Sequence, residues 1–135
     1  MKQTGVWLDK NKALIVTLEN DTETLQTVSS DIDHYHEQDS LGNYIERNPL
    51  NIIKESGILN REKQQLKTYF KNIVSVIENT DELVIFGPAE TNEKFSKELN
   101  DSYPNLSICV KGVKKADSMT DNQVRAWVRD FFNSN

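Results

Sequence analysis

The 135-residue sequence contains a single cysteine, and no apolar run approaches the ~18 residues that a membrane-spanning helix requires. One cysteine excludes an intrachain disulfide. The first residues lack the apolar stretch of a signal peptide. Together these absences predict a protein of the reducing cytoplasm without a membrane partner.

Positive charge is also in the minority, with 16 lysines and arginines against 21 acidic residues. The net charge of −5 excludes a protein coated with cationic residues for nucleic-acid binding, but it leaves room for local basic faces. Apolar residues make up 36% and charged residues 27%, which fits a globular domain and excludes a fibre or a low-complexity chain. At this length we expect one domain, residues 1–135, which needs neither disulfides nor metal to fold.

Short apolar runs near the start predict a meander of antiparallel strands. Clusters of Asn and Asp separate these runs, which cover residues 6–8, 13–18 and 24–28. Residues 83–86 are all apolar and suit a central parallel strand, whereas the alternating residues 106–110 suit an edge strand. Cys109 lies in this last run, and we interpret it as a partly buried strand residue, not as a nucleophile.

Three later stretches have helical periodicity. The clearest covers residues 60–79, with Asn60 as its N-cap. Its apolar stripe consists of Leu66, Tyr69, Phe70, Ile73, Val74 and Ile77. A shorter helix ends near Asp101, and the last helix opens with a capping box formed by Thr120 and Gln123.

The predicted element order is β-β-β-α-β-α-β-α. Two tight hairpins place the first three strands side by side, and the two helical crossovers join parallel neighbours. We therefore predict an α/β fold with a mixed five-stranded sheet of order 3-2-1-4-5 and helices on both faces, the ribonuclease H-like arrangement. The expected core includes Leu66, Phe70, Ile73, Val84, Ile85, Val124, Trp127 and Val128.

Nuclease activity would require several carboxylates around two metal ions ~3.5–4 Å apart. The first strand offers only Asp9, and the fourth ends in Phe86-Gly87 without an acid. Glu62 lies at the first turn of its helix. We therefore interpret Asp9 as a turn residue and do not predict a two-metal nuclease.

Four groups of residues resemble one known family. They are 5–9 (Gly-Val-Trp-Leu-Asp), 61–63 (Arg-Glu-Lys) with Tyr69-Phe70, 85–90 (Ile-Phe-Gly-Pro-Ala-Glu), and 116–123 (Ala-Asp-Ser-Met-Thr-Asp-Asn-Gln) with Phe131-Phe132. Together they look like small bacterial, translation-machinery-like proteins related to the middle domain of archaeal and eukaryotic peptide-chain release factors and of Pelota. The resemblance covers nearly the whole chain and implies the same fold.

This resemblance places function in the segment between the third strand and the first helix, residues 29–60. In release factors the segment carries Gly-Gly-Gln, which enters the ribosomal peptidyl-transferase centre and promotes hydrolysis of peptidyl-tRNA. Here it contains no Gly-Gly-Gln, and Gly42 is followed by Asn43 and Tyr44. The resemblance thus implies a translation module without this hydrolysis, and we lean against an enzyme.

The segment 29–60, which we predict to be a long loop, suggests two alternatives. His34 and His36 share a face if the chain is extended, and with nearby carboxylates they could serve a metal-dependent hydrolase. No further His or Cys completes a ligand set, so no metal or other cofactor is predicted. Six acids against two bases give the segment a net charge of −4, which disfavours phosphate and suits a protein partner or a homodimeric scaffold.

Basic residues gather elsewhere, along one flank of the first helix and after the fifth strand. The candidates for contact with RNA phosphate are Arg61, Lys63, Lys67, Lys71, Lys111, Lys114 and Lys115. Arg125 and Arg129 share a face of the last helix. Gly87, Pro88 and Ala89 form a candidate anion site at a helix N-terminus. The leading interpretation is a non-catalytic module of the translation machinery with a ribosome or RNA partner.

Overall fold

The computed structural model describes residues 1–30, 51–88 and 90–133, with the backbone alone over 51–62. The elements in chain order are β1 (Lys2–Leu8), β2 (Lys12–Glu19), β3 (Thr22–Ser29), α2 (Asn51–Ile77), β4 (Glu82–Gly87), α3 (Thr91–Ser102), α4 (Pro104–Ser107), β5 (Val110–Lys115) and α5 (Asp121–Asn133). No helix of this described part is long and apolar enough to cross a membrane.

The five strands form one mixed sheet of order β3-β2-β1-β4-β5, which confirms the predicted topology. β1 pairs with β2 and β2 with β3 in antiparallel fashion, whereas β1–β4 and β4–β5 are parallel. Asn20 and Asp21 join β2 to β3 with φ angles of 50° and 69°. Two consecutive positive φ angles are typical of a type I′ turn, which matches the twist of the paired strands and is tolerated by Asn and Asp.

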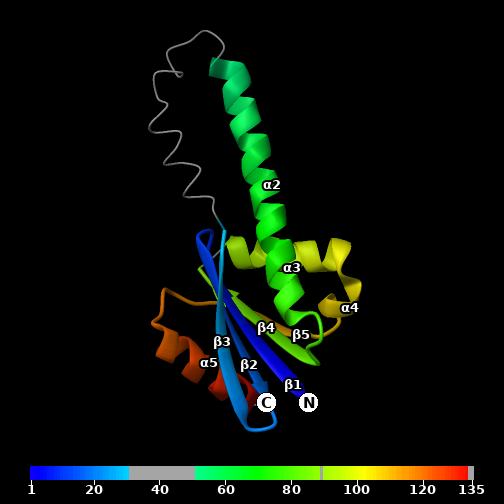
Figure 1. Ribbon diagram of the computed structural model, residues 1–135, viewed down its shortest axis with the longest axis vertical. Coiled ribbons are helices and arrows are strands. Elements are labelled where there is room, and N and C mark those ends of the chain that lie inside the picture. Colours follow the sequence, from blue (N-terminus) through cyan, green and yellow to red (C-terminus); the bar gives the residue numbers. More distant parts are fainter. Residues whose placement is uncertain (31–50, 89, 134–135) are drawn as a thin grey trace.

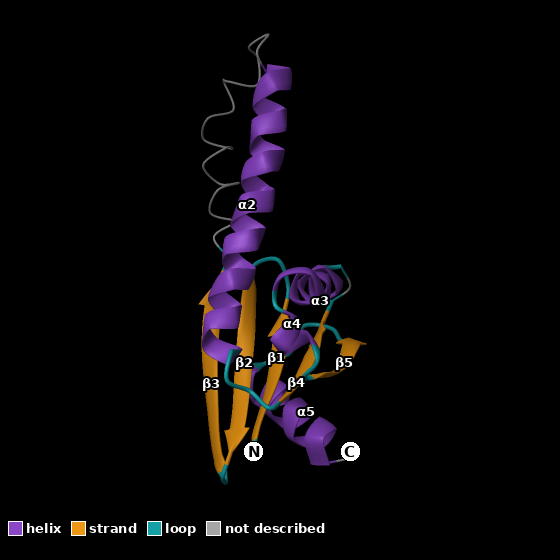
Figure 2. Cartoon of the chain, turned by 90° about the vertical axis from the view of Figure 1, so that its right-hand side faces the viewer, coloured by secondary structure: helices purple, strands orange, loops and turns teal. Residues whose placement is uncertain are grey.

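Helices cover both faces of the sheet, as predicted (Figures 1 and 2). One face packs against α2 and α3 through a core that includes Val6, Ile15, Ile73 and Ile85. The other face packs against α5 through Trp7, Leu14, Val84, Phe86, Val124 and Val128. Successive strand residues point to opposite faces, so the continuous apolar runs of β1 and β4 supply both cores.

Most of the predicted core residues are buried, namely Phe70, Ile73, Val84, Ile85, Val124 and Val128. Leu66 and Trp127 are only partly buried, so their placement in the closed core was wrong. Trp127 stacks on buried Phe86, with ring centroids 3.8 Å apart and planes 9° apart. Periodicity placed Trp127 on the apolar face of α5, but it does not reveal how much of so large a ring that face covers.

The first long helix begins nine residues earlier than the sequence predicted, because α2 starts at Asn51. The predicted N-cap Asn60 therefore lies inside the helix, and residues 51–60 belong to α2 and not to a long loop. An interior Asn costs only about 0.7 kcal/mol, and the interior Gly57 about 1 kcal/mol, relative to alanine. Neither residue is sufficient to end a helix of 27 residues.

The fifth strand also lies elsewhere than predicted. Leu106 belongs to the short helix α4, and β5 starts at Val110. Pro104 stands at the start of α4, where its fixed φ favours a helical turn. Cys109 is half-buried in the turn before β5 and not in a strand. Consequently the candidate lysines Lys111, Lys114 and Lys115 lie within β5 and not after it.

The capping box of α5 has the predicted form. The backbone N–H of Gln123 donates to the Thr120 hydroxyl at 3.2 Å, and the Thr120 N–H donates to the Gln123 side-chain oxygen at 2.9 Å. α3 buries Phe95 and Leu99 as expected, and it ends at Ser102. These two helices were predictable because their boundaries depend on local residues.

α2 extends well beyond the sheet (Figures 1 and 2). Its 27 residues make a rod of ~40 Å at ~1.5 Å per residue. Within its described side chains, burial begins at Gln65 and Leu66 and continues through Tyr69, Phe70 and Ile73. The helix is therefore anchored by its second half, and its first half projects past the sheet.

Candidate functional site

The carboxyl ends of four strands meet at one edge of the sheet, because β1, β3, β4 and β5 all run in the same direction. Ser30 leaves the sheet at this edge, and α2 projects past it (Figure 1). Ligands of open α/β sheets bind outside the carboxyl ends of the strands. The carboxyl ends of the strands are therefore the candidate functional site.

The β1–β2 turn is held rigidly by Asp9. Its carboxylate oxygen Oδ1 accepts the backbone N–H groups of Asn11 at 2.8 Å and Lys12 at 2.9 Å. The Ser30 hydroxyl donates to the carbonyl oxygen of Lys10 at 2.5 Å, which fixes the end of β3 on the same turn. The predicted role of Asp9 as a turn residue is therefore correct.

Tyr69 connects α2 to this turn. Its hydroxyl donates a hydrogen bond of 2.9 Å to the carbonyl oxygen of Asp9. Burial raises the pKa of Tyr69 well above its usual range, and the negative charge of Asp9 raises it further. Tyr69 thus stays protonated and acts as a donor that anchors the helix, not as a base.

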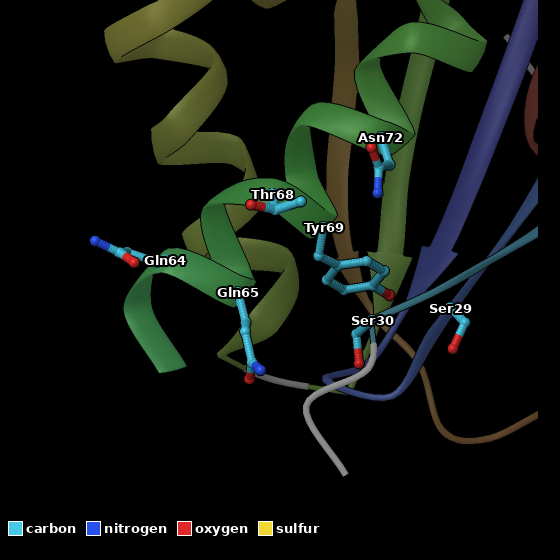
Figure 3. Close-up of a pocket in the computed structure, with 7 residues that line it drawn as sticks. All are labelled: Ser29, Ser30, Gln64, Gln65, Thr68, Tyr69 and Asn72. Carbon is cyan, nitrogen blue, oxygen red and sulfur yellow. The ribbon is translucent and has the colours of Figure 1, made fainter. Parts of the chain in front are cut away.

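A polar cavity of about 300 Å³ lies between the end of β3 and the first packed turns of α2 (Figure 3). Its lining consists of Ser29, Ser30, Gln64, Gln65, Thr68, Tyr69 and Asn72. The Tyr69 ring extends toward Ser30, whereas Gln64 points away. The Gln65 side-chain oxygen is buried and has no hydrogen-bond partner among the described residues.

The chemistry of this lining is hydrogen bonding by neutral groups. Hydroxyls and amides can hold a polar group, but they do not supply a titrating acid–base pair near neutral pH. The sequence patterns did not predict this cluster. Its only sequence signal is a neutral polar stripe beside the apolar stripe of α2, at Gln65, Thr68 and Asn72.

Several predicted site residues lie outside the described residues. These are His34, His36, Gly42, Asn43, Tyr44 and Ala89, together with the side chain of Arg61. Within the described ranges, no group of three or more His, Cys, Asp and Glu side chains could hold a metal ion. The functional loop and the metal hypothesis therefore remain predictions.

Three lysines of α2 form one exposed row, called here the lysine row. Lys63, Lys67 and Lys71 recur every four residues and are all exposed. The same side of the helix carries Phe70, whose ring lies 5.1 Å from Phe95 of α3. The lysine row therefore lies on the α3 side of α2, opposite the flank that lines the cavity.

The β5 lysines lie on another part of the surface. α2 contacts β3, which is the outer strand on one side of the sheet, whereas β5 is the outer strand on the other side. Lys111, Lys114 and Lys115 are exposed there, and Lys111 Nζ lies 3.9 Å from a Glu82 carboxylate oxygen. The structure thus does not bring the two groups of candidate RNA-binding lysines together.

The two arginines of α5 are already paired. Arg125 lies 3.6 Å and Arg129 3.4 Å from the carboxylate of Glu23 on β3. These ion pairs tie α5 to the edge strand. They give both arginines a structural role that their shared helical face did not reveal.

Gly87 is required by backbone packing at the candidate anion site. Its φ is +142°, and a β-carbon there would lie 2.3 Å from the carbonyl oxygen of Leu8. α3 begins at Thr91, so Pro88 precedes the helix. Glu90 and Glu93 add negative charge around the helix start. The geometry therefore explains Gly87 without an anion, and anion binding remains a prediction.

No family model and no curated protein matches this sequence. Two solved structures are similar to this chain. The Thermoplasma acidophilum Pelota protein matches 100% of this chain and 32% of its own length, with a TM-score of 0.55 and 16% sequence identity. The archaeal translation termination factor aRF1 matches 98% of this chain and 38% of its own length, with a TM-score of 0.56 and 10% identity.

These similarities concern the fold. The chain spans about a third of each of the two proteins, at an identity too low to transfer a function. Its α/β fold, with a sheet of order β3-β2-β1-β4-β5, matches that of the release factor middle domain. This agrees with the fold expected from the sequence resemblance.

Proposed function

We propose that this chain is a ribosome- or RNA-associated module of the translation machinery that does not hydrolyse peptidyl-tRNA. The observation that carries the proposal is the similarity to Pelota and to an archaeal translation termination factor over essentially the whole chain. The segment between β3 and α2 leaves the carboxyl edge of the sheet, where the sequence resemblance places function.

The lysine row of α2 supports an RNA partner. Lys63, Lys67 and Lys71 lie on the exposed flank of a helix whose first half projects from the domain. A row of ammonium groups at one-turn spacing suits the repeated negative charge of a phosphate backbone. The rest of the acidic protein would be directed away from the RNA.

Two features support a non-catalytic role. The segment 29–60 contains no Gly-Gly-Gln and has six acidic residues against two basic ones. An acidic segment is repelled by a tunnel lined with phosphates. The described residues that line the cavity at the start of this segment offer neutral hydroxyls and amides.

Co-sedimentation of the purified protein with ribosomes tests the proposed partner. Wild-type protein is expected to bind at low salt, and the logarithm of its affinity should fall linearly with the logarithm of salt concentration. K67E/K71E should weaken binding and lower this slope by roughly 1–2. K94E/K97E places the same charge reversal on exposed residues of α3 and should bind like wild type.

Release of labelled peptide from stalled ribosome complexes tests the absence of hydrolysis. We expect no release above buffer. Release that is abolished by Asn43→Ala would show that Asn43 replaces the missing glutamine, and it would contradict the proposal. Stoichiometric zinc in the purified protein would instead favour a hydrolase that uses His34 and His36.

A further inference from the structure

β3 is an edge strand with an open side. Glu19 and Thr22 are partners across the two-residue turn, and the pairing continues to Lys12 and Ser29. In such a hairpin alternate residues direct their N–H and C=O groups at the neighbouring strand. Thr22, Thr24, Gln26 and Val28 therefore face β2, and the backbone groups of Glu23, Leu25 and Thr27 face outward. Among the described residues, none pairs with these outward groups.

The two edges of the sheet differ in their protection against pairing. β5 carries three lysines and a glycine in six residues, and its pairing with β4 shifts register between Leu83 and Val84. Lysines and bulges are the usual means by which sheet edges avoid pairing with other chains. β3 has eight residues without lysine, proline or a register shift. Its single charge, Glu23, is already paired with Arg125 and Arg129.

Within residues 63–77, the flank of α2 beside β3 carries neutral side chains. Gln65, Thr68 and Asn72 line the cavity together with the end of β3. Val76 lines a second hollow together with Thr24 and Gln26, to which Lys2 and Glu19 add one positive and one negative charge. Lys63, Lys67 and Lys71 lie on the opposite flank of the helix. In a chain with 27% charged residues, the described part of this side has few charged residues, as the centres of protein interfaces do.

We propose that β3 pairs antiparallel with β3 of a second copy of this chain, about a two-fold axis at Gln26, and joins the two sheets into one. This inference goes beyond the proposed function. The outward groups of Leu25 would then pair with those of Thr27 in the partner, and Glu23 would face Ser29. Glu23 never faces Glu23, so two chains of net charge −5 meet at this edge without a direct like-charge pair across the new strand pairing.

Sedimentation equilibrium over a range of protein concentrations tests this interface. The mass should rise from 15.5 kDa toward twice that value. Thr27→Pro removes an outward N–H, a change that edge strands tolerate. It should weaken dimerisation at least about tenfold, because the symmetric interface loses two main-chain hydrogen bonds. Ile108→Lys serves as the control, because Ile108 is 80% exposed and lies in a turn away from β3. This variant should show the same dependence of mass on concentration as wild type.

A charge-swap experiment tests the position of the axis. Gln26 is exposed and is expected to lie opposite its own copy. Gln26→Lys and Gln26→Glu alone should therefore each weaken dimerisation several-fold, while an equimolar mixture should form heterodimers more readily than either variant forms homodimers. A wild-type mass of 15.5 kDa at every concentration would overturn the proposal. A dimer indifferent to Thr27→Pro and to both Gln26 variants, each checked for a folded thermal transition, would also overturn it.

Discussion

The hydroxyl of Tyr69 and the carbonyl oxygen of Asp9 form a 2.9 Å hydrogen bond at the point where α2 leaves the sheet. Asp9 in turn organises the β1–β2 turn, on which the end of β3 also rests through Ser30. One bond thus connects the projecting helix to the edge from which the segment 31–50 departs. The geometry of the candidate site depends on this anchor.

Tyr69→Phe should lower the free energy of unfolding by about 1 kcal/mol, because it leaves the Asp9 carbonyl without this donor and keeps the ring in place. Tyr103→Phe is the matched control, since no hydrogen bond to the Tyr103 hydroxyl occurs among the described residues. It should change stability by less than about 0.5 kcal/mol. Urea denaturation measures both, and equal stability of the two variants would show that the Tyr69 bond contributes nothing.

The same residue predicts a pH dependence at the alkaline end. Because burial raises the pKa of Tyr69 in the folded state, the folded protein keeps a proton that the unfolded chain releases above pH ~10. The protonated Tyr69 hydroxyl contributes fully to the free energy of unfolding below that pH. Above it, this contribution falls by up to about 1.4 kcal/mol per pH unit. The stability difference between wild type and Tyr69→Phe should therefore shrink between about pH 8 and about pH 11. A constant difference would contradict the raised pKa.

Gly5 of β1 packs directly against Val128 of α5. A β-carbon there would lie 2.3 Å from Val128 Cγ2. Gly5→Ala should therefore cost about 1–3 kcal/mol through overpacking. In G5A/V128A the two effects should not add, because the shortened side chain at 128 makes room for the new methyl group. Strictly additive losses in thermal or urea denaturation would show that α5 simply moves away from β1.

Much of this fold is predictable from local pattern. The sheet order followed from two hairpins and two right-handed crossovers, and the start of α5 from the Thr120–Gln123 pair. The start of α2 could not be predicted in this way. Asn60 is acceptable both as an N-cap and inside a helix, and an interior Asn costs less than about 1 kcal/mol relative to alanine. β5 was misplaced because half of its residues are lysines, and pairing with β4 decides its position.

The candidate site was less predictable than the fold. The lysine row on α2 was visible as a four-residue repeat. The cavity was not, because Ser29 and Gln65 are far apart in the sequence and only the packing of α2 beside β3 brings them together. Arg125 and Arg129 were grouped correctly, but their partner Glu23 lies on a strand about 100 residues away, beyond the reach of helical periodicity.

Recovery of the native complex from cells at mild salt tests most directly whether this chain works on the ribosome, as we propose. The measured quantity is the amount of ribosomal RNA that copurifies with tagged wild-type protein, with K67E/K71E and with K94E/K97E. We predict abundant ribosomal RNA with wild type and with K94E/K97E, and a clear loss with K67E/K71E. Wild-type complexes without ribosomal RNA, or with equal amounts for both variants and a salt-independent yield, would contradict the account.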